Sequence, residues 1–357
     1  MKFIDLFSGI GGFRLALESL GLECVFSSEI DKFAKQTYKA NFGIEPHGDI
    51  TKIDSKDIPN HDILTAGFPC QAFSIAGKRR GFDDTRGTLF FEVARIIRDK
   101  QPKAFILENV PGLVSHEKGS TFQTIIDTLA TTINGQKSFI ETDNLGYHVY
   151  YGYLNSKDFG VAQNRKRIFI VGFRESINFR FPGPANSTVK LKDILETEVD
   201  EKYYLSEKQI NSLISHAENQ KEKGNSFSSK IITRENLNSP TLTTRYFSNS
   251  QFLLDENIII GKDLKPKRNQ DIASCLTVGG HSGGNHSDMD LLLSSTGIRR
   301  LTPRECAKLQ GFLESYKIVC SDSQAYKQFG NSVTVNVIQA IAKNVLDSLF
   351  YYSQKVG

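Results

Sequence analysis

Apolar residues recur along the first 175 positions in short runs that alternate with longer segments of helical periodicity. The runs "KFIDLF", "ECVFSSEI", "DILTAG", "AFILENV", "YHVYYGYLN" and "RIFIVGF" have the length of strands. Between them lie "GFRLALESLG", "DKFAKQTYKANFG", "GTLFFEVARIIRDK" and "TFQTIIDTLATTI", which are typical of helices. This alternation predicts an α/β fold, a doubly wound parallel or mixed sheet with helices on both faces. Such a sheet binds ligands at the carboxyl ends of its strands.

The pattern changes near position 180. The pieces become short, polar and rich in Ser, Thr, Asn and Gly, as in "LTVGGHSGGNHSDMD", which predicts brief strands and wide loops in a smaller, irregular, mostly-β domain. Helical patterns return with "TPRECAKLQGF", where a Thr cap precedes Pro, and with "NSVTVNVIQAIAKNVLDSLF". We therefore expect a first domain over 1–180, a second over 181–297, and a C-terminal segment, 298–357, that returns to the first.

Composition narrows the class of protein only slightly. The 357 residues include five cysteines without close pairs, which favours neither a disulfide framework nor a C-x-x-C metal site. No apolar run approaches the roughly 20 residues of a membrane span, and the N-terminus lacks a signal peptide's apolar region, so we expect a cytoplasmic protein. The net charge of +4 is compatible with a polyanionic partner but is also common in proteins that bind none.

The segment "GFPCQAFSIAGKRRGFDDTRGTLFF", residues 67–91, places Cys70 directly behind a proline. Its glycines and polar residues predict a surface loop that presents the thiol rather than burying it. A thiol is already a good nucleophile near neutral pH and gains from neighbouring cations. Lys78, Arg79, Arg80 and Arg86 follow in the same loop and either serve that role or contact phosphate, and a solvated charge run is the alternative interpretation.

A glycine-rich turn, "DLFSGIGG", joins the first strand to the first helix, where backbone N–H groups face a ligand. It does not match G-x-G-x-x-G, so a dinucleotide fits poorly and a nucleoside with an amino-acid tail fits no worse. Glu29 ends the second strand, where a carboxylate accepts hydrogen bonds from ribose hydroxyls. Asp49 ends a segment that we interpret as a third strand. Its carboxylate either accepts a hydrogen bond from an adenine amino group or forms a turn. A tight turn and an ordinary strand-end Glu are the structural alternatives.

Two further strand ends carry candidate chemistry. Glu108 and Asn109 end the apolar strand "AFILENV", and a carboxyl held against apolar walls has a raised pKa and acts as an acid or donor. A strand-terminal helix cap is the alternative. In "QNRKRIFIVG" we expect Arg165 and Arg167 on one side of an entering strand and Lys166 on the other, so that a buried guanidinium donates to a carbonyl oxygen. A pair of surface arginines is the alternative.

Taken in order, these motifs resemble the DNA (cytosine-5) methyltransferase family of the bacterial restriction-modification type. The elements PCQ, ENV, QxRxR and GNSV follow in family order and spacing, and the resemblance returns at "RRLTPRECAKLQGF" and "SQAYKQFGNSVTVNVIQAIAKNV". The resemblance implies a Rossmann-like, S-adenosylmethionine-dependent methyltransferase domain with a target-recognition domain. The segment from about 185 to 295 does not follow the pattern, and in this family that is where the target sequence is read.

The resemblance also implies a reaction. The methyl group of S-adenosyl-L-methionine is transferred to C5 of a cytosine within a specific short sequence of double-stranded DNA, after the base is flipped out of the duplex. Cys70 matches the nucleophile that adds to C6, Glu108 the group at N3 and Arg165 the group at O2. Asn109 and Arg167 complete the catalytic set.

For the cofactor, the resemblance implies adenine packed on Phe7 and the methionine end along the glycines. Ile30 is a departure, because some relatives carry an aromatic residue there. No metal is implied, and the product is S-adenosyl-L-homocysteine. The expected cofactor residues are Phe7, Gly9, Gly11, Gly12, Glu29, Asp49, Ile50, Pro69, Asn331 and Ser332.

Two segments resemble the Thr-Leu element of the family's recognition domains. These are "SPTLTTR" (239–245) and "ASCLTVGGHSGGNH" (273–286), and we favour the second because its glycines permit close approach to a DNA groove. A glycine-rich surface loop is the alternative, and no motif indicates which bases are read. The expected DNA contacts are Ser74, Lys78, Arg79, Arg80, Arg86, Arg245, Thr277, Gly279 and Gly280.

The resemblance favours a monomer that acts on double-stranded DNA in the bacterial cytoplasm or nucleoid, away from membranes, and shares its site with a cognate restriction endonuclease without a stable complex. An RNA-directed relative is the nearest rival, and the "PCQ" context and long recognition segment favour DNA. A DNA-binding protein with a degenerate methyltransferase fold is disfavoured by the intact Cys70, Glu108 and Arg165. A nicotinamide oxidoreductase has no use for Pro-Cys-Gln.

Overall fold

The computed structural model describes residues 1–69, 89–137, 144–185, 189–206, 208–209, 258–260, 273–274, 291–294 and 297–356. The chain forms two compact units, the first made of Met1–Phe159, Lys166–Asn186 and Ser332–Gly357, the second of Gly160–Arg165 and Ser187–Asn331. Residues 298–331, which we expected to return to the first domain, lie in the second unit, and so do residues 160–165. A contact within the second unit joins these two segments, because the Gln163 side chain donates to the Leu309 carbonyl over 3.1 Å.

The first unit is built on one eight-stranded sheet, in the order β2-β1-β3-β4-β9-β7-β5-β6. Strands β2, β1, β3 and β4 run parallel, and β9 lies antiparallel between β4 and β7. The mixed sheet of the sequence prediction is therefore confirmed. The bounds are β1 Lys2–Leu6, β2 Glu23–Ser28, β3 Ile63–Gly67, β4 Ala104–Asn109, β5 Ala130–Ile133, β6 Gln136–Lys137, β7 Tyr147–Asn155 and β9 Lys166–Phe173.

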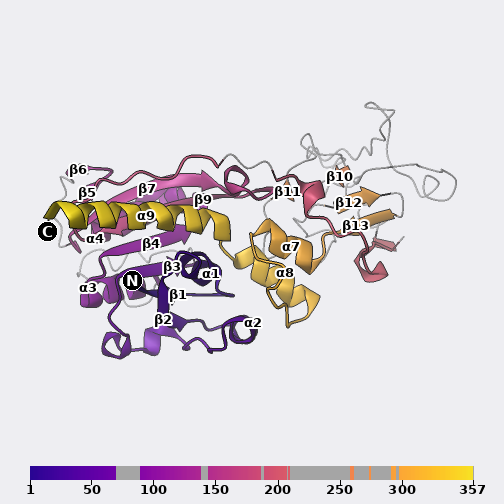
Figure 1. Ribbon diagram of the computed structural model, residues 1–357, viewed down its shortest axis with the longest axis horizontal. Helices are drawn as coiled ribbons and strands as arrows, with labels where there is room; N and C mark the ends of the chain where they lie inside the picture. The colour runs from indigo at the N-terminus through magenta and orange to yellow at the C-terminus, as the bar shows by residue number, and fades with distance from the viewer. Residues whose placement is uncertain are drawn as a thin grey trace. The chain divides into compact units, whose positions relative to one another are not determined.

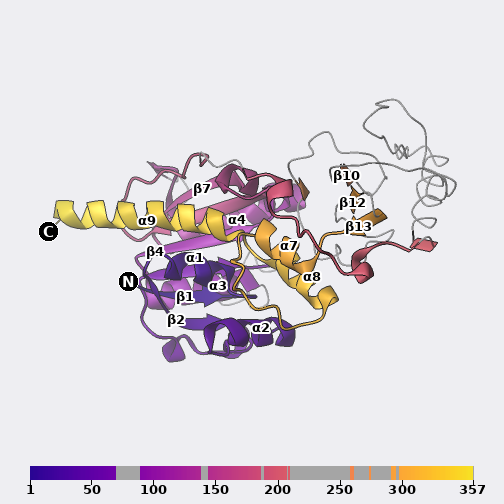
Figure 2. The same cartoon turned by 45° about the vertical axis from the view of Figure 1, so that its right-hand side comes forward.

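Helices cover both faces of this sheet, as a doubly wound fold requires (Figure 1). On one face, α1 (Gly12–Glu18) and α9 (Val335–Val356) pack on a core that includes Phe3 and Ile106. On the other, α3 (Leu89–Lys100) and α4 (Ser120–Leu129) pack on a core that includes Ile4 and Phe105. In Figure 2 α9 runs along the sheet beside α1. No helix within the described ranges is both long and apolar enough for a membrane span.

Local sequence explains where most of these elements begin and end. The Asp31 carboxylate caps α2 (Lys32–Phe42) by accepting from the N–H groups of Phe33 and Ala34, and Gly43, at φ 72°, ends the helix. The predicted helix over 121–133 is too long, because it ends at Leu129 and the β-branched residues that follow form β5. The predicted third strand ending at Asp49 is wrong, since the described chain there makes one isolated bridge, Ser28 to His47.

Short strands, α-helices and brief 3₁₀ turns make up the described part of the second unit. Its buried ion pair joins Arg299 to Glu305 at 2.8 Å, with side chains only 3% and 0% exposed. Glu305 also closes a capping box with Thr302 at the start of α7, the helix start that the sequence predicted. The bounds are β8 Gln163–Asn164, β10 Ile258–Ile260, β11 Ala273–Ser274, β12 Leu291–Ser294, β13 Gly297–Arg300, α7 Pro303–Leu309 and α8 Asp322–Asn331.

Candidate active site

The glycine-rich turn between β1 and α1 has an unusual backbone. Phe7, Gly9 and Gly11 have φ values of 56°, 54° and 86°. A β-carbon on Gly11 would lie 2.3 Å from the Phe42 ring, so only glycine fits there. A β-carbon on Gly9 would meet no described atom within 4 Å. The turn is therefore open above Gly9, and the strained Phe7 backbone is of the kind that clusters at ligand sites.

Glu29 fastens this turn to the end of β2. Its Oε2 accepts from the Gly9 N–H at 2.8 Å, and its Oε1 accepts from the N–H groups of Ile30 and Asp31 at 2.8 and 2.7 Å. Both lone pairs of Oε1 are used by these bonds, whereas Oε2 keeps a second lone pair. Glu29 thus holds the turn and still offers one acceptor to a hydroxyl group.

Asp49 caps a short 3₁₀ turn, Ile50–Lys52, at the same edge of the sheet. Its Oδ1 accepts from the Thr51 hydroxyl at 2.8 Å and from the Thr51 N–H at 3.1 Å. The hydrogen bond from that hydroxyl is the main reason that the pKa of Asp49 is lowered. Asp49 is a turn-forming residue and a charged acceptor at once, and the Ile50 side chain is buried beside it.

The start of the C-terminal segment reaches the same turn within the first unit. A β-carbon on Gly12 would lie 2.8 Å from Val333 Cγ2 and 2.9 Å from Ser332 Oγ. Gly12 is therefore required for this close approach. Asn331, the other cofactor residue predicted in this segment, is the last residue of α8 and belongs to the second unit.

Glu108 lies at the carboxyl end of β4 and is paired with an arginine. Its Oε1 is 3.1 Å from Arg167 Nε, and the two side chains are 12% and 14% exposed. The carboxyl that the sequence predicted against apolar walls is therefore paired with a guanidinium. The Oε2 atom lies 3.8 Å from the place where a β-carbon on Gly67 would be. Gly67 thus leaves space beside this carboxylate.

Asn109 ties the end of β4 to the chain that leads to the predicted nucleophile. Its Nδ2 donates to the Phe68 carbonyl at 2.9 Å, and its Oδ1 accepts from the Val110 N–H at 2.8 Å. Pro69 follows Phe68 and is exposed. Cys70 itself lies outside the described residues, and so do all the predicted DNA contacts, Ser74, Lys78, Arg79, Arg80, Arg86, Arg245, Thr277, Gly279 and Gly280.

The two predicted arginines do not share one strand. Strand β9 begins at Lys166, so Arg167 is in the sheet of the first unit while Arg165 precedes the strand and belongs to the second unit. Arg165 is only 3% exposed, and its Nη2 donates to the Gly330 carbonyl at 3.1 Å. The expected position of both arginines in one strand is therefore wrong. The expected buried guanidinium is confirmed, and the alternative of two surface arginines is not what the structure contains. Lys166 is exposed, with its ammonium 4.6 Å from the centre of the Tyr153 ring.

Two of the three described thiols, Cys24 and Cys306, are poor candidates for the nucleophile. Burial raises the pKa of Cys24 to about 12 and raises the pKa of Cys306 well above its usual range. Both are therefore protonated at neutral pH, and the thiolate is the reactive form. Within the described part of the chain, no three His, Cys, Asp or Glu side chains form a group suited to a metal ion.

One buried residue at this edge was missed by sequence reasoning. Asp5 on β1 is fully buried, and its Oδ1 accepts from the Thr65 hydroxyl at 2.9 Å. Its Oδ2 is buried without a hydrogen-bond partner among the described residues, as are the hydroxyls of Ser8 and Ser28. The sequence signal for this residue was one acidic side chain, Asp5, within the otherwise apolar strand "FIDLF". Polar atoms buried at the glycine turn fit a polar ligand better than an apolar one.

Burial raises the pKa of Asp5 to about 8, against the opposing hydrogen bond from Thr65. The folded protein thus keeps this proton up to pH 8, whereas the unfolded chain loses it near pH 4. The Asp5 contribution to stability is complete below pH 4 and is lost as the pH rises toward 8. We expect Asp5→Asn to remove this dependence, which amounts to at most about 1.4 kcal/mol per pH unit.

Urea unfolding of wild type and Asp5→Asn at pH 5, 6.5 and 8 tests this expectation. The difference in unfolding free energy should move in favour of the variant at each step. Asp57→Asn, at an exposed position, is the control and should track wild type. If the difference in unfolding free energy between wild type and Asp5→Asn were the same at all three pH values, Asp5 would not be protonated in the folded protein.

Comparison with known proteins identifies the family. The family model described as C-5 cytosine-specific DNA methylase matches residues 1–347, nearly the whole chain. The chain belongs to this family. The resemblance drawn from the motifs is confirmed, and the enzyme class is DNA (cytosine-5) methyltransferase.

Similar proteins agree with this assignment over most of their length. The methylase is 46% identical to the type II methyltransferase M1.ScrFI of Lactococcus lactis subsp. cremoris over 98% of this chain and 78% of the relative. It is 47% identical to M.HpaII of Haemophilus parainfluenzae (97% and 89%) and 40% identical to M.HhaI of Haemophilus parahaemolyticus (98% and 95%).

Solved structures show the same fold at low identity. The Entamoeba histolytica methyltransferase EhMeth superposes with a TM-score of 0.66 at 18% identity, over 98% of both chains. The S. pombe Dnmt2 methyltransferase gives 0.64 at 18% identity, over 98% of this chain and 99% of that one. The α/β, Rossmann-like fold class predicted from the sequence is therefore confirmed.

Proposed function

We propose that this methylase transfers the methyl group of S-adenosyl-L-methionine to C5 of one cytosine within a specific short sequence of double-stranded DNA. The target base is flipped out of the duplex, at a cost of a few kcal/mol for unstacking, because the ring is otherwise out of reach. The reaction passes through a covalent bond between Cys70 and cytosine C6.

The observation that carries this proposal is the arrangement at the end of β4. Glu108 pairs with Arg167 there, and the next residue, Asn109, holds the Phe68 carbonyl two positions before Cys70. One strand end therefore positions a carboxylate and anchors the stem of the segment that bears the thiol. A carboxyl at the end of a rigid strand, beside an anchor for the chain two residues before the nucleophile, suits addition to a ring carbon coupled to protonation of a ring nitrogen.

The proposed cofactor residues of the first unit form a second group. In this proposal Phe7 packs on adenine, Asp49 accepts from its amino group with Ile50 beside it, and Glu29 binds the ribose hydroxyls. The space above Gly9 accepts the methionine end, with Gly11, Gly12, Pro69 and Ser332 as further first-unit residues, and Asn331 is proposed from the resemblance alone. When bound, S-adenosyl-L-methionine supplies an electrophilic methyl group.

The chain's own residues make cytosine C5 reactive. The Cys70 thiolate forms a bond to C6 while N3 takes a proton from Glu108, and Arg165 donates to O2. This addition converts the ring to an enamine whose C5 accepts the methyl group. Methyl transfer leaves S-adenosyl-L-homocysteine as the second product. Loss of the C5 proton to a base, departure of the Cys70 thiolate and return of the N3 proton to Glu108 then restore the neutral aromatic ring. Electrostatic stabilisation of charge at N3 and O2 is the largest contribution expected of the site.

Target reading is proposed for the second unit, with the element at Thr277, Gly279 and Gly280 favoured over the one at Arg245. Ser74, Lys78, Arg79, Arg80 and Arg86 are proposed to contact phosphates around the flipped base. Because the relatives are named type II methyltransferases, we propose that this cytoplasmic enzyme protects the sites of a restriction endonuclease, acting as a monomer without a stable complex.

We expect the protein to label DNA but not tRNA when it is incubated with S-adenosylmethionine carrying a tritiated methyl group. Bisulfite sequencing of plasmid DNA exposed to the enzyme should then show protected cytosines in one shared short context. If tRNA were labelled and DNA were not, the proposed substrate would be wrong. Methylation without a shared context would overturn only the proposal of a dedicated reading element.

A further inference from the structure

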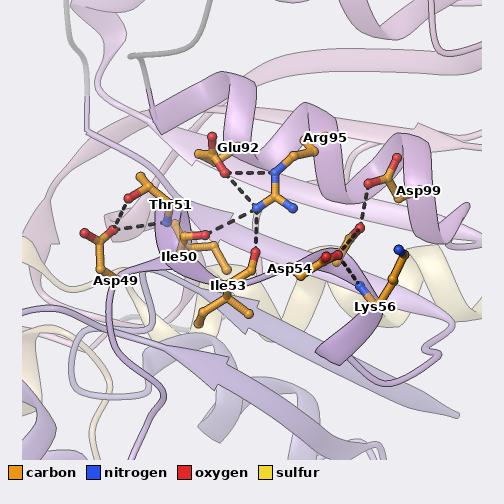
Figure 3. A network of polar contacts seen from close by, with 10 residues as sticks. Asp49, Ile50, Thr51, Ile53, Asp54, Lys56, Glu92, Arg95 and Asp99 are labelled. Atoms are coloured by element: carbon orange, nitrogen blue, oxygen red, sulfur yellow. Dashed lines mark hydrogen bonds and ion pairs between the residues drawn. The ribbon is translucent and has the colours of Figure 1, made fainter. Parts of the chain in front are cut away.

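Arg95 on α3 contacts the turn that carries Asp49 (Figure 3). Its Nη2 donates to the carbonyl oxygens of Ile50 and Ile53, at 3.3 and 3.0 Å. These two carbonyls belong to the same short stretch of backbone, one at the start of the 3₁₀ turn and one directly after it. One guanidinium thus spans the whole turn from outside.

Glu92 holds that guanidinium in place from the preceding turn of the helix. Its Oε2 lies 3.0 Å from Arg95 Nε and 2.7 Å from Arg95 Nη2. The two side chains are 18% and 25% exposed, so the pair is partly shielded from solvent. Two N–H groups of the guanidinium converge on this one carboxylate oxygen, which limits rotation of the guanidinium plane in a way that the single ammonium of a lysine would not.

The helix does not depend on Arg95 for its own position. Five residues on its other face are buried in the core, namely Phe90, Val93, Ala94, Ile96 and Ile97. The bonds of the turn itself lie within Asp49–Ile53. Its backbone is closed by Lys52 N–H to the Asp49 carbonyl at 3.0 Å and by Ile53 N–H to the Ile50 carbonyl at a long 3.3 Å, and the Asp49 carboxylate caps it through Thr51. A three-residue 3₁₀ turn has poor hydrogen-bond geometry, and the two bonds from Arg95 tie its backbone to α3.

We propose that Arg95 is a positioning residue for the adenine end of the cofactor site. It fixes the Ile50–Lys52 turn against α3, so that the Asp49 carboxylate and the Ile50 backbone keep one orientation toward the nucleobase. This inference rests on the proposed function, which places adenine at Asp49 and Ile50. It adds that recognition of the adenine amino group depends on a helix that does not itself touch the nucleobase.

The proposal predicts a loss of selectivity as well as of affinity. If the turn is held only loosely, the Asp49 carboxylate reaches the adenine amino group in a smaller fraction of the turn's conformations. The ratio of affinities for adenine and for a base without that amino group then becomes smaller. A useful probe is S-inosylhomocysteine, in which an oxygen replaces the amino group of S-adenosylhomocysteine. The affinity ratio of the two ligands then measures recognition of the amino group directly.

Isothermal titration with both ligands is the test, applied to wild type, Arg95→Ala and Arg95→Lys. Arg95→Ala should bind S-adenosylhomocysteine about tenfold more weakly, the loss expected when hydrogen bonds from a charged donor are removed. The preference over S-inosylhomocysteine should fall by a factor of about three or more, and Arg95→Lys should not restore it. In turnover, KM for S-adenosylmethionine should rise by a larger factor than kcat falls.

Ser55→Ala is the matched control. The Ser55 hydroxyl donates to Asp99 Oδ2 at 2.6 Å, one helical turn further along α3, so the variant also removes one contact between this helix and the same connecting segment. It should keep both affinities and their ratio. Arg95→Ala with wild-type affinities would overturn the inference, and so would an equal change in both variants. Wild type that binds neither ligand would instead overturn the proposed function.

Discussion

Replacing Cys70 with serine should reduce turnover by at least about a thousandfold, the scale seen when a covalent nucleophile is removed. A serine hydroxyl has a much higher pKa than a thiol and does not readily add to C6 at neutral pH. The substitution changes a single atom in a segment whose stem is held by the bond from Asn109 to Phe68. Affinities for DNA and for S-adenosylhomocysteine, measured by gel shift and calorimetry, should therefore stay within about threefold of wild type.

A covalent trap identifies the same residue independently. DNA with 5-fluorocytosine at the target should remain bound to wild type after denaturation, because fluorine does not leave C5 as a proton does. Peptide mapping should place the adduct on Cys70. Cys320→Ser, which alters a half-buried thiol of the second unit, is the control and should turn over normally. An adduct at Cys24, Cys275, Cys306 or Cys320 would refute the assignment.

Glu108→Gln should lower kcat by roughly 10² to 10⁴, the usual contribution of a positioned general acid. Glutamine keeps the size of the side chain and still accepts a hydrogen bond from Arg167, but its amide N–H is far too weak an acid to transfer a proton to cytosine N3. The rate constant for methyl transfer in a single turnover should fall, while binding of the cofactor and of DNA remains measurable. Rapid-quench kinetics at saturating DNA and cofactor give that rate constant directly.

Glu18→Gln is the matched control for this loss. Glu18 is also paired with an arginine, Arg14, at 2.7 Å, and lies in the same unit away from the strand end of Glu108. It should retain single-turnover kinetics close to wild type. If the Glu108 variant were equally active, the carboxyl would be a structural partner of Arg167 and another group would have to protonate the base.

The periodic part of the sequence predicted the sheet correctly. Runs such as "AFILENV" are long, apolar and rich in β-formers, and residues 104–107 are completely buried in β4. The helix start at Thr302 followed from a local capping pattern that the structure contains. These predictions were correct because a strand buried on both faces needs a continuous apolar run, and a helix cap needs particular residues a fixed number of positions apart. Both are properties of one short segment of sequence.

The failures occurred where spacing along one segment was taken as placement in space. Arg165 and Arg167 alternate as strand neighbours do, yet β9 begins between them and Arg165 bonds to Gly330 in the second unit. Asp49 ends no strand because its carboxylate is engaged in capping a turn. The second unit likewise includes 160–165, because Gln163 bonds to Leu309, far along the chain.

The sequence by itself determined the fold class, the family, and the residue types available for chemistry, since hydrophobic periodicity and ordered motifs are properties of single segments. Only the tertiary structure decided which polar groups meet. It paired Glu108 with Arg167, anchored Phe68 to Asn109, buried Asp5 at the glycine turn, and placed Arg95 on the carbonyls of Ile50 and Ile53. The physical reason is that hydrogen bonds and ion pairs act over about 3 Å in space. Nothing in the order of residues states which segments far apart in the chain come within that distance.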